Sequence, residues 1–180
     1  MHEGTLDFDP QGEDLAKFAS LGSVASRRPQ IPGYELDRRI GEGSFGEVWA
    51  AVQTSTGQKV AVKILQRTDL GALTYLEREV SRLADLGDHP NLLTLIDANL
   101  VHVPAFLVTP LLGGSLEQYT GQPVLVSQVV DWMQDVAVAL AFIHGRGILH
   151  CDLKPSNLLQ DREARIKVVD FGQAHLLEQM

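Results

Sequence analysis

The residues with the clearest chemical potential lie in the last third of the chain. His150, Asp152 and Asn157 have the spacing H-x-D-x-x-x-x-N, and Lys154 follows the aspartate by two positions. Asp170-Phe171-Gly172 begins thirteen residues after the asparagine, behind an apolar segment. An aspartate and an asparagine on neighbouring loops supply the oxygen ligands that Mg²⁺ prefers, and a second aspartate can accept a hydroxyl proton.

A glycine-rich segment and a lysine lie upstream of these residues. Gly41, Gly43 and Gly46 form a G-x-G-x-x-G pattern, and glycine lets a backbone approach phosphate groups closely. Lys63 ends the apolar segment Val60-Ala61-Val62-Lys63, where it can hold phosphate oxygens if a carboxylate orients it. Taken alone, these two features also fit a plain hairpin turn and a surface lysine. The segment after the glycines favours a strand, which disagrees with a dinucleotide fingerprint, and no Walker Gly-Lys-Ser/Thr is present.

The elements that must position these residues follow from hydrophobic periodicity. The alternation of apolar residues and a turn at 55–57 predict three strands, and a three-and-four spacing predicts a helix after them. Two apolar segments then favour strands, and a second helix begins at Ser127 or a near neighbour as its N-cap. A region of short strands carries the last motifs. The predicted ranges are strands 34–40, 47–54, 58–65, 92–101 and 105–112, with helices 70–86 and 127–143. The predicted fold class is therefore α+β in two parts.

The first predicted helix carries two acidic side chains that are candidates to orient the lysine. Glu77 and Glu79 both flank its apolar stripe, so periodicity alone does not choose between them.

Composition excludes several functional classes. The chain has 180 residues, with 15 Lys+Arg against 23 Asp+Glu and a formal net charge of −8, which argues against a general nucleic-acid binder. Its one cysteine, Cys151, excludes an intrachain disulfide and suits a reducing, cytoplasmic location. No secretory leader is evident, and the most apolar stretch, residues 124–144, carries polar residues that predict a buried helix instead of a membrane span. Residues 1–30 are expected to form a flexible N-terminal tail.

The motifs GEGSFGEV, VAVK, HCDLKPSN and DFG, in this order, resemble the signature set of protein kinases, over about residues 34–175. Lys154-Pro155 resembles the serine/threonine branch. The resemblance implies ATP and Mg²⁺ as cofactors, a protein hydroxyl as acceptor, an N-lobe over 31–112 and the start of a C-lobe over 113–180. It also implies catalytic roles for Asp152, Lys154, Lys63 and Glu79, and metal ligation by Asn157 and Asp170. Glu79 fits the family pattern better than Glu77.

The resemblance further implies a set of nucleotide contacts. Val48, Ala61 and Leu159 would enclose adenine, Thr109 would lie at the back of the pocket, and Pro110 and Leu112 would form the hinge. The full implied set is Ile40, Gly41, Glu42, Gly43, Ser44, Phe45, Gly46, Val48, Ala61, Lys63, Thr109, Pro110, Leu112 and Leu159.

Two departures from the family pattern affect the expected activity. Cys151 replaces an arginine that grips a phosphorylated activation loop in the family, so phosphorylation there is not expected to switch this chain on. The sequence ends eight residues after Gly172, so we expect a kinase domain truncated after its Asp-Phe-Gly motif, similar to the eukaryotic-like kinases of bacteria. A partner chain could then cover the incomplete C-lobe. The alternatives are an ATP-binding or interaction module without transfer, and a small-molecule phosphotransferase, against which Lys154-Pro155 and the complete glycine loop weigh.

Overall fold

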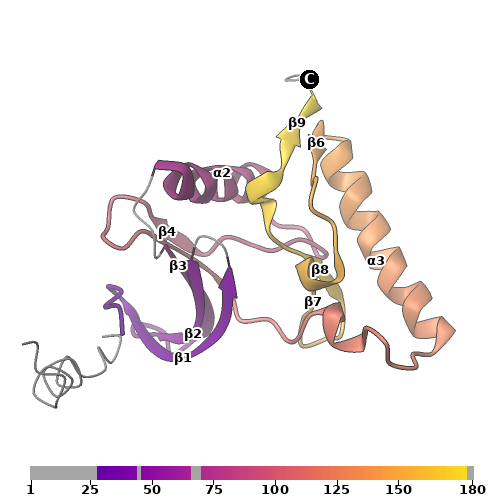
Figure 1. Cartoon of the computed structure of the whole chain (residues 1–180), viewed down its shortest axis with the longest axis horizontal. Coiled ribbons are helices and arrows are strands. Elements are labelled where there is room, and N and C mark those ends of the chain that lie inside the picture. Colours follow the sequence, from indigo (N-terminus) through magenta and orange to yellow (C-terminus); the bar gives the residue numbers. More distant parts are fainter. Residues whose placement is uncertain (1–27, 44–45, 66–69, 178–180) are drawn as a thin grey trace, which may run out of the picture.

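The computed structural model describes residues 28–43, 46–65 and 70–177. Most of the expected N-terminal tail therefore lies outside the described residues, as do Ser44 and Phe45 of the glycine segment. The described part is α+β, as predicted, and it divides into a strand-rich half with one helix and a second half containing a long helix and short strands (Figure 1).

The first half is a five-stranded antiparallel sheet in the order β1-β2-β3-β5-β4. Its strands are β1 (Tyr34–Gly43), β2 (Gly46–Gln53), β3 (Lys59–Leu65), β4 (Asp97–Asn99) and β5 (Phe106–Pro110). Because side chains alternate along β3, Val60, Val62 and Ile64 enter one core cluster, while Ala61 and Lys63 face the other side of the sheet. The strand predicted at 58–65 from this alternation is confirmed.

Helix α2 (Leu70–Leu86) lies across one face of the sheet (Figure 1). Lys63 is on this face, because its side chain contacts Glu79 of the helix. Its apolar residues Ala72 and Leu76 pack with Leu65 and Leu107 from β3 and β5. The helix has the predicted bounds, and it stops because Gly87 adopts a left-handed conformation with φ 63°.

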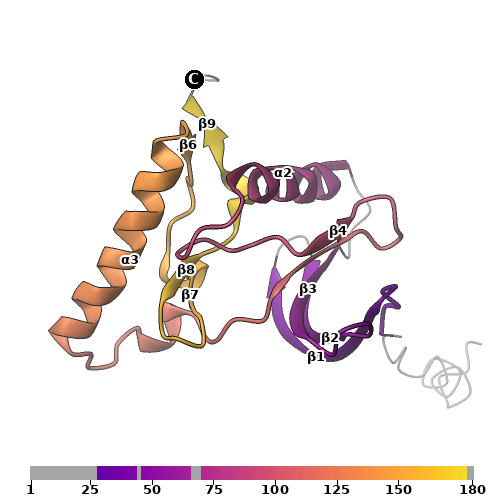
Figure 2. The ribbon, with the colours of Figure 1, turned by 180° about the vertical axis from the view of Figure 1, so that it is seen from behind.

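The second half is built around α3 (Val126–His144), which flanks two small sheets (Figure 2). These sheets pair β6 (Ile148–Leu149) with β9 (His175–Leu176), and β7 (Leu158–Gln160) with β8 (Ile166–Val168). Three short 3-10 helices complete the half: η1 (Leu116–Tyr119), η2 (Pro155–Asn157) and η3 (Phe171–Gln173).

One core cluster joins the two halves. It contains Leu83 and Leu86 from α2, Trp132 and Ile143 from α3, and Phe171, which is fully buried. Burial of these large apolar side chains in one cluster fixes α2 against the segment that carries Asp170.

One predicted strand is largely wrong. Only residues 97–99 of the predicted strand 92–101 lie in the sheet; Leu92 instead forms an isolated parallel bridge with Val168 of the second half. This apolar segment connects the two halves, so its hydrophobicity reflects core packing. The N-cap of α3 is Leu125, a near neighbour of Ser127 as the prediction allowed, and it makes no side-chain hydrogen bond.

Helix α3 also differs from its predicted character. By length and composition it is apolar enough to cross a membrane, despite the polar residues that argued against this. Within the fold, however, Asp135 of this helix accepts a hydrogen bond from the Ile166 backbone N–H at 2.8 Å, and Trp132 and Val136 are buried. Several apolar side chains on the rest of the helix are exposed: Val126, Val129, Val130, Met133 and Val138.

Candidate active site

Lys63 and Glu79 form an ion pair between β3 and α2. The lysine Nζ lies 2.5 Å from Glu79 Oε2, and Glu79 is almost completely buried. Glu77, the alternative that periodicity left open, is exposed on the helix surface. Helix geometry decides between them, because residues two positions apart point in different directions.

Burial dominates the electrostatics of Glu79. Loss of solvation raises its pKa, and the attraction of Lys63 opposes this only in part. Burying the Glu79 carboxylate therefore costs desolvation free energy. Such buried charges are common at functional sites, where they contribute to function more than to stability.

Lys63 also connects this pair to the Asp-Phe-Gly segment. Its Nζ lies 3.7 Å from Asp170 Oδ1, so a single ammonium group faces two carboxylates from different elements. Asp170 adopts a left-handed backbone conformation with φ 66°, which is uncommon for a residue with a side chain. The neighbouring Val169 N–H donates to the Asn157 carbonyl at 3.0 Å, so the segment is anchored beside the asparagine.

Asp152, Lys154 and Asn157 form a second connected group. Lys154 Nζ donates to Asp152 Oδ2 at 2.7 Å, and Asn157 Nδ2 donates to both the carbonyl and Oδ2 of Asp152 at 2.9 and 3.1 Å. The hydrogen bond from Lys154 lowers the pKa of Asp152, so this carboxylate is ionised at neutral pH and accepts hydrogen bonds.

His150 holds this loop against the Asp-Phe-Gly segment. Its Nε2 lies 2.9 Å from the Val169 carbonyl and its Nδ1 accepts from the Asp152 N–H at 3.3 Å. A neutral ring with its proton on Nε2 satisfies both contacts, and burial lowers the pKa of His150 accordingly. The ring also meets Phe171 edge-on, with centroids 5.0 Å apart.

Lys63, Asp170, Asn157 and Asp152 are therefore linked in series. Lys63 forms an ion pair with Asp170. Asp170 follows Val169, whose N–H donates to the Asn157 carbonyl, and the Asn157 side chain donates to Asp152. They come from β3, the loop before η2, η2 itself and the residue before η3.

Four of the predicted nucleotide contacts, Val48, Ala61, Lys63 and Thr109, share one face of the sheet. The strand register places Val48 opposite Lys63, and Ala61 opposite Thr109. Val48 and Ala61 are partly exposed on this face, whereas Thr109 is buried. Leu159, the remaining adenine contact, is partly exposed and bridges Ser115 in the second half.

The glycine segment approaches its neighbouring strand closely. A Cβ on Gly46 would overlap the carbonyl oxygen of Ile64, so only glycine fits there. Ile40 is exposed, Glu42 is paired with Arg39 at 3.1 Å, and Gly41 and Gly43 lie in the pairing with β2.

An ionic network that the motifs did not predict braces the two strands that carry the glycine segment. The buried Glu47 accepts hydrogen bonds from Trp49 Nε1 at 2.8 Å and from Arg39 at 3.0 Å. The pairing register of β1 and β2 places Arg39 opposite Trp49, a relation that the sequence alone does not show.

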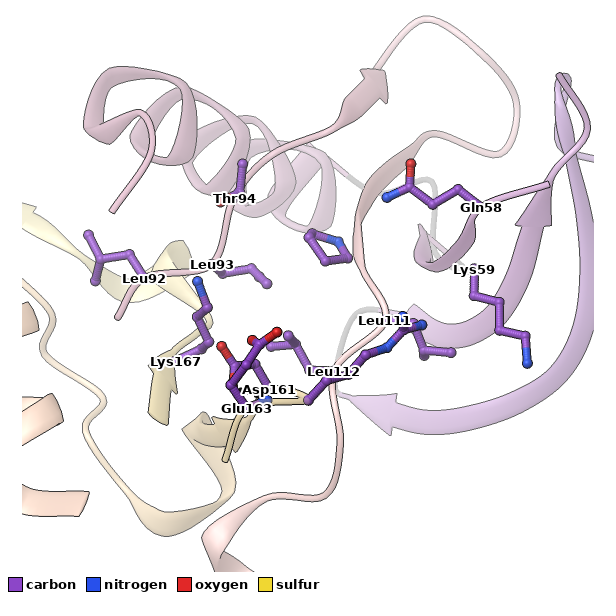
Figure 3. Close-up of a pocket in the computed structure, with 12 residues that line it drawn as sticks. Gln58, Lys59, Leu92, Leu93, Thr94, Leu111, Leu112, Asp161, Glu163 and Lys167 are labelled. Carbon is purple, nitrogen blue, oxygen red and sulfur yellow. Dashed lines mark hydrogen bonds between the residues drawn. The ribbon is translucent and has the colours of Figure 1, made fainter. Parts of the chain in front are cut away.

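A pocket of about 270 Å³ lies beside the connection between the halves (Figure 3). Pro110 and Leu112 of the predicted hinge line it, together with Lys59 from β3 and the charged residues Asp161 and Lys167. Its lining contains neither the Lys63 pair nor the Asp152 group, so this pocket and the predicted catalytic residues are separate features of the described residues.

The residues available for a metal ion are few but suitable. In the described ranges there is no group of three or more His, Cys, Asp or Glu side chains arranged as a metal site. Asp170 and the amide oxygen of Asn157 are hard oxygen donors, and the Asn157 amide nitrogen is already engaged by Asp152. One or two protein oxygens, with substrate phosphates and water completing the shell, is the usual arrangement for Mg²⁺.

The fold brings a lysine–glutamate pair beside glycine-containing strands to an aspartate–asparagine loop and an Asp-Phe-Gly segment, an arrangement typical of domains that transfer phosphoryl groups from nucleotides. The protein kinase domain family matches residues 34–180. The chain belongs to the protein kinase family.

Three of the similar proteins are protein kinases by name. The chain is 35% identical over 160 residues to CBL-interacting protein kinase 16 of Oryza sativa subsp. japonica, covering 86% of this chain and 35% of that protein. It is 30% identical over 182 residues to CBL-interacting serine/threonine-protein kinase 18 of Arabidopsis thaliana, covering 98% and 35%. For the carbon catabolite-derepressing protein kinase of Saccharomyces cerevisiae the identity is 35% over 152 residues, covering 82% and 24%.

These comparisons also concern the extent of the kinase sequence in this chain and its expected similarity to bacterial kinases. The chain spans about a quarter to a third of the length of these relatives. The relatives come from plants and yeast, so the expected similarity to bacterial kinases finds no support in them.

Proposed function

We propose that this chain carries the ATP-binding and phosphoryl-transfer residues of a serine/threonine protein kinase, which moves the γ-phosphate of ATP to a protein hydroxyl. The observation that supports this best is the pair of contacts made by Lys63, at 2.5 Å from Glu79 and 3.7 Å from Asp170. They place a cation between the helix and the segment that would hold Mg²⁺, where it can bind nucleotide phosphates.

Asp152 and Lys154 are the residues proposed to act on the acceptor. Asp152 is ionised and only partly exposed, so it can orient a hydroxyl and accept its proton as transfer proceeds. Lys154 is exposed and hydrogen-bonded to the same carboxylate, so it can also neutralise charge on the transferring group.

Asn157 and Asp170 would hold Mg²⁺, which when bound neutralises phosphate charge. The chain's own contribution is orientation: Asn157 is buried and fixed by Asp152, and Asp170 is fixed next to it through Val169. Val48, Ala61 and Leu159 present apolar surface suited to a purine ring.

A second candidate function is ATP binding or protein interaction without transfer. It is favoured by the exposed apolar side chains of α3, such as Val126 and Val130, which a further polypeptide would cover. We also propose that the phosphate acceptor is a protein, that a partner chain covers α3, and that the protein is cytoplasmic.

The test is phosphate transfer from ³²P-labelled ATP to a mixture of serine/threonine peptides, with Mg²⁺ present. Transfer that is lost in Asp152→Asn and Lys63→Met, with unchanged circular dichroism, would support a kinase. Thermal stabilisation by Mg·ATP without transfer would select the second candidate. Transfer that persists in both variants would overturn the residue assignments.

A further inference from the structure

Tyr75 of α2 contacts the segment that would hold the metal ion. Its hydroxyl donates a hydrogen bond to Asp170 Oδ1 at 2.7 Å. Tyr75 lies four positions before Glu79, and residues with this spacing share one helix face. None of the motifs includes this tyrosine, and the roles proposed above do not use it.

The aromatic ring of Tyr75 contacts the same segment at a second point. A Cβ placed on Gly172 would fall within this ring, which therefore lies directly on the glycine backbone. Tyr75 thus contacts the residues on both sides of Phe171, which is itself fully buried. One side chain restrains the whole turn by its hydroxyl at one end and by its ring at the other.

The backbone of Asp170, which accepts this hydrogen bond, has an unfavourable conformation. Asp170 has φ 66° and ψ 74°, a left-handed conformation that is disfavoured for residues with a Cβ. On its N-terminal side, Val169 is held by its hydrogen bond to the Asn157 carbonyl. The Tyr75 hydroxyl fixes the aspartate side chain, which a backbone hydrogen bond leaves free to rotate.

The position of the carboxylate matters because Lys63 faces the same oxygen. Asp170 Oδ1 lies between the tyrosine hydroxyl at 2.7 Å and the lysine ammonium at 3.7 Å, and the lysine Nζ is 5.4 Å from the centre of the tyrosine ring. The hydrogen bond and the ion pair both involve Oδ1, so Oδ2 can serve a cation.

We propose that Tyr75 is a positioning residue, whose hydroxyl and ring hold the Asp170–Gly172 turn against α2 and orient the Asp170 carboxylate for Mg²⁺. This inference rests on the proposed function for its metal role. It assigns to α2 a second link to the metal-binding segment, besides the Lys63–Glu79 pair.

The test compares Tyr75→Phe with a matched control, Tyr34→Phe. The first variant keeps the ring on Gly172 and removes only the hydroxyl. The control removes a similar hydrogen bond, from the Tyr34 hydroxyl to Asp97 at 2.9 Å, at a place remote from the metal segment. Mn²⁺ binding in the presence of ADP, followed by electron paramagnetic resonance, reports on the metal ligands. ADP binding in EDTA reports on the nucleotide site without metal.

Tyr75→Phe is expected to weaken Mn²⁺ binding about tenfold, as loss of a hydrogen bond to a metal-ligating side chain does. ADP affinity in EDTA should change less than about twofold, because the hydrogen bond that is removed ends on the metal-binding carboxylate. Hydrogen exchange of residues 169–174 without nucleotide should become faster. Tyr34→Phe should leave all three measurements unchanged.

Unchanged Mn²⁺ binding in Tyr75→Phe would overturn the inference, and tighter binding would mean that the hydroxyl competes with the metal instead of orienting its ligand. If the wild-type chain binds no Mn²⁺ with ADP, the proposed function and the metal role fail together. Hydrogen exchange distinguishes a failure of the proposed function from a failure of this inference. Equal exchange of residues 169–174 in the wild type and in Tyr75→Phe would refute the restraint on the turn, whether or not metal binds.

Discussion

Replacing Glu79 should separate the stability of the fold from the affinity for nucleotide. In Glu79→Gln the amide oxygen still accepts a hydrogen bond from the Lys63 ammonium. The acceptor has lost its charge, so this hydrogen bond is weaker by about 1 kcal/mol. The variant also removes the desolvation cost that raises the pKa of Glu79. The two effects oppose each other, so the free energy of unfolding should change by less than about 1 kcal/mol.

Glu79→Ala removes the acceptor as well as the charge. The Lys63 ammonium is then left with Asp170 at 3.7 Å, in a side chain that is 24% exposed. Because some solvent still reaches it, we expect a loss near the low end of the range for a broken buried pair, about 3 kcal/mol. Mg·ATP affinity should fall about fivefold in the glutamine variant, since Lys63 is oriented less firmly, and further in the alanine variant.

The raised pKa of Glu79 also predicts how the unfolding free energy depends on pH. Because the pKa of Glu79 is raised in the folded state, its contribution to stability is full below its unfolded pKa and declines as pH rises through the folded value. The unfolding free energy of the wild type, minus that of Glu79→Gln, should therefore increase as pH is lowered from 7 toward 5.

Urea denaturation and Mg·ATP titration calorimetry measure these quantities, with Glu77→Gln as the control. Glu77 is exposed on the same helix, so its replacement should change the unfolding free energy by less than about 0.5 kcal/mol. Equal effects at positions 77 and 79, or a glutamine variant as unstable as the alanine variant, would refute the reasoning.

Two further predictions concern the glycine segment and the loop histidine. Gly46→Ala should lower the unfolding free energy by about 1–3 kcal/mol, because the added Cβ meets the Ile64 carbonyl, whereas at Gly41 it makes an ordinary contact with Val48 at 3.6 Å. Urea denaturation of both alanine variants checks this, and equal losses would contradict it. Burial lowers the pKa of His150, so its NMR titration midpoint should lie below 6.5, and a midpoint at or above that value would contradict the neutral ring assigned here.

The local elements could be predicted from the sequence because their causes are local. The alternation of β3 and the periodicity of α2 follow from which side chains must be buried, and both elements have the expected faces. The strand expected at 92–101 could not be assigned correctly, because a buried connecting segment and a strand have the same apolar composition. Leu92 is buried against the second half, which no local pattern reveals.

The sequence alone determined the residue types of the site and, through its ordered motifs, the family to which the chain belongs. The family pattern already favoured Glu79 over Glu77 as the partner of Lys63, but only the tertiary structure shows which side chains meet. Glu79 and not Glu77 contacts Lys63, because the docking of α2 on the sheet selects one helix face. The same docking brings Tyr75 to Asp170, 95 positions away, and a contact of that range depends on how two elements pack and not on the spacing within either.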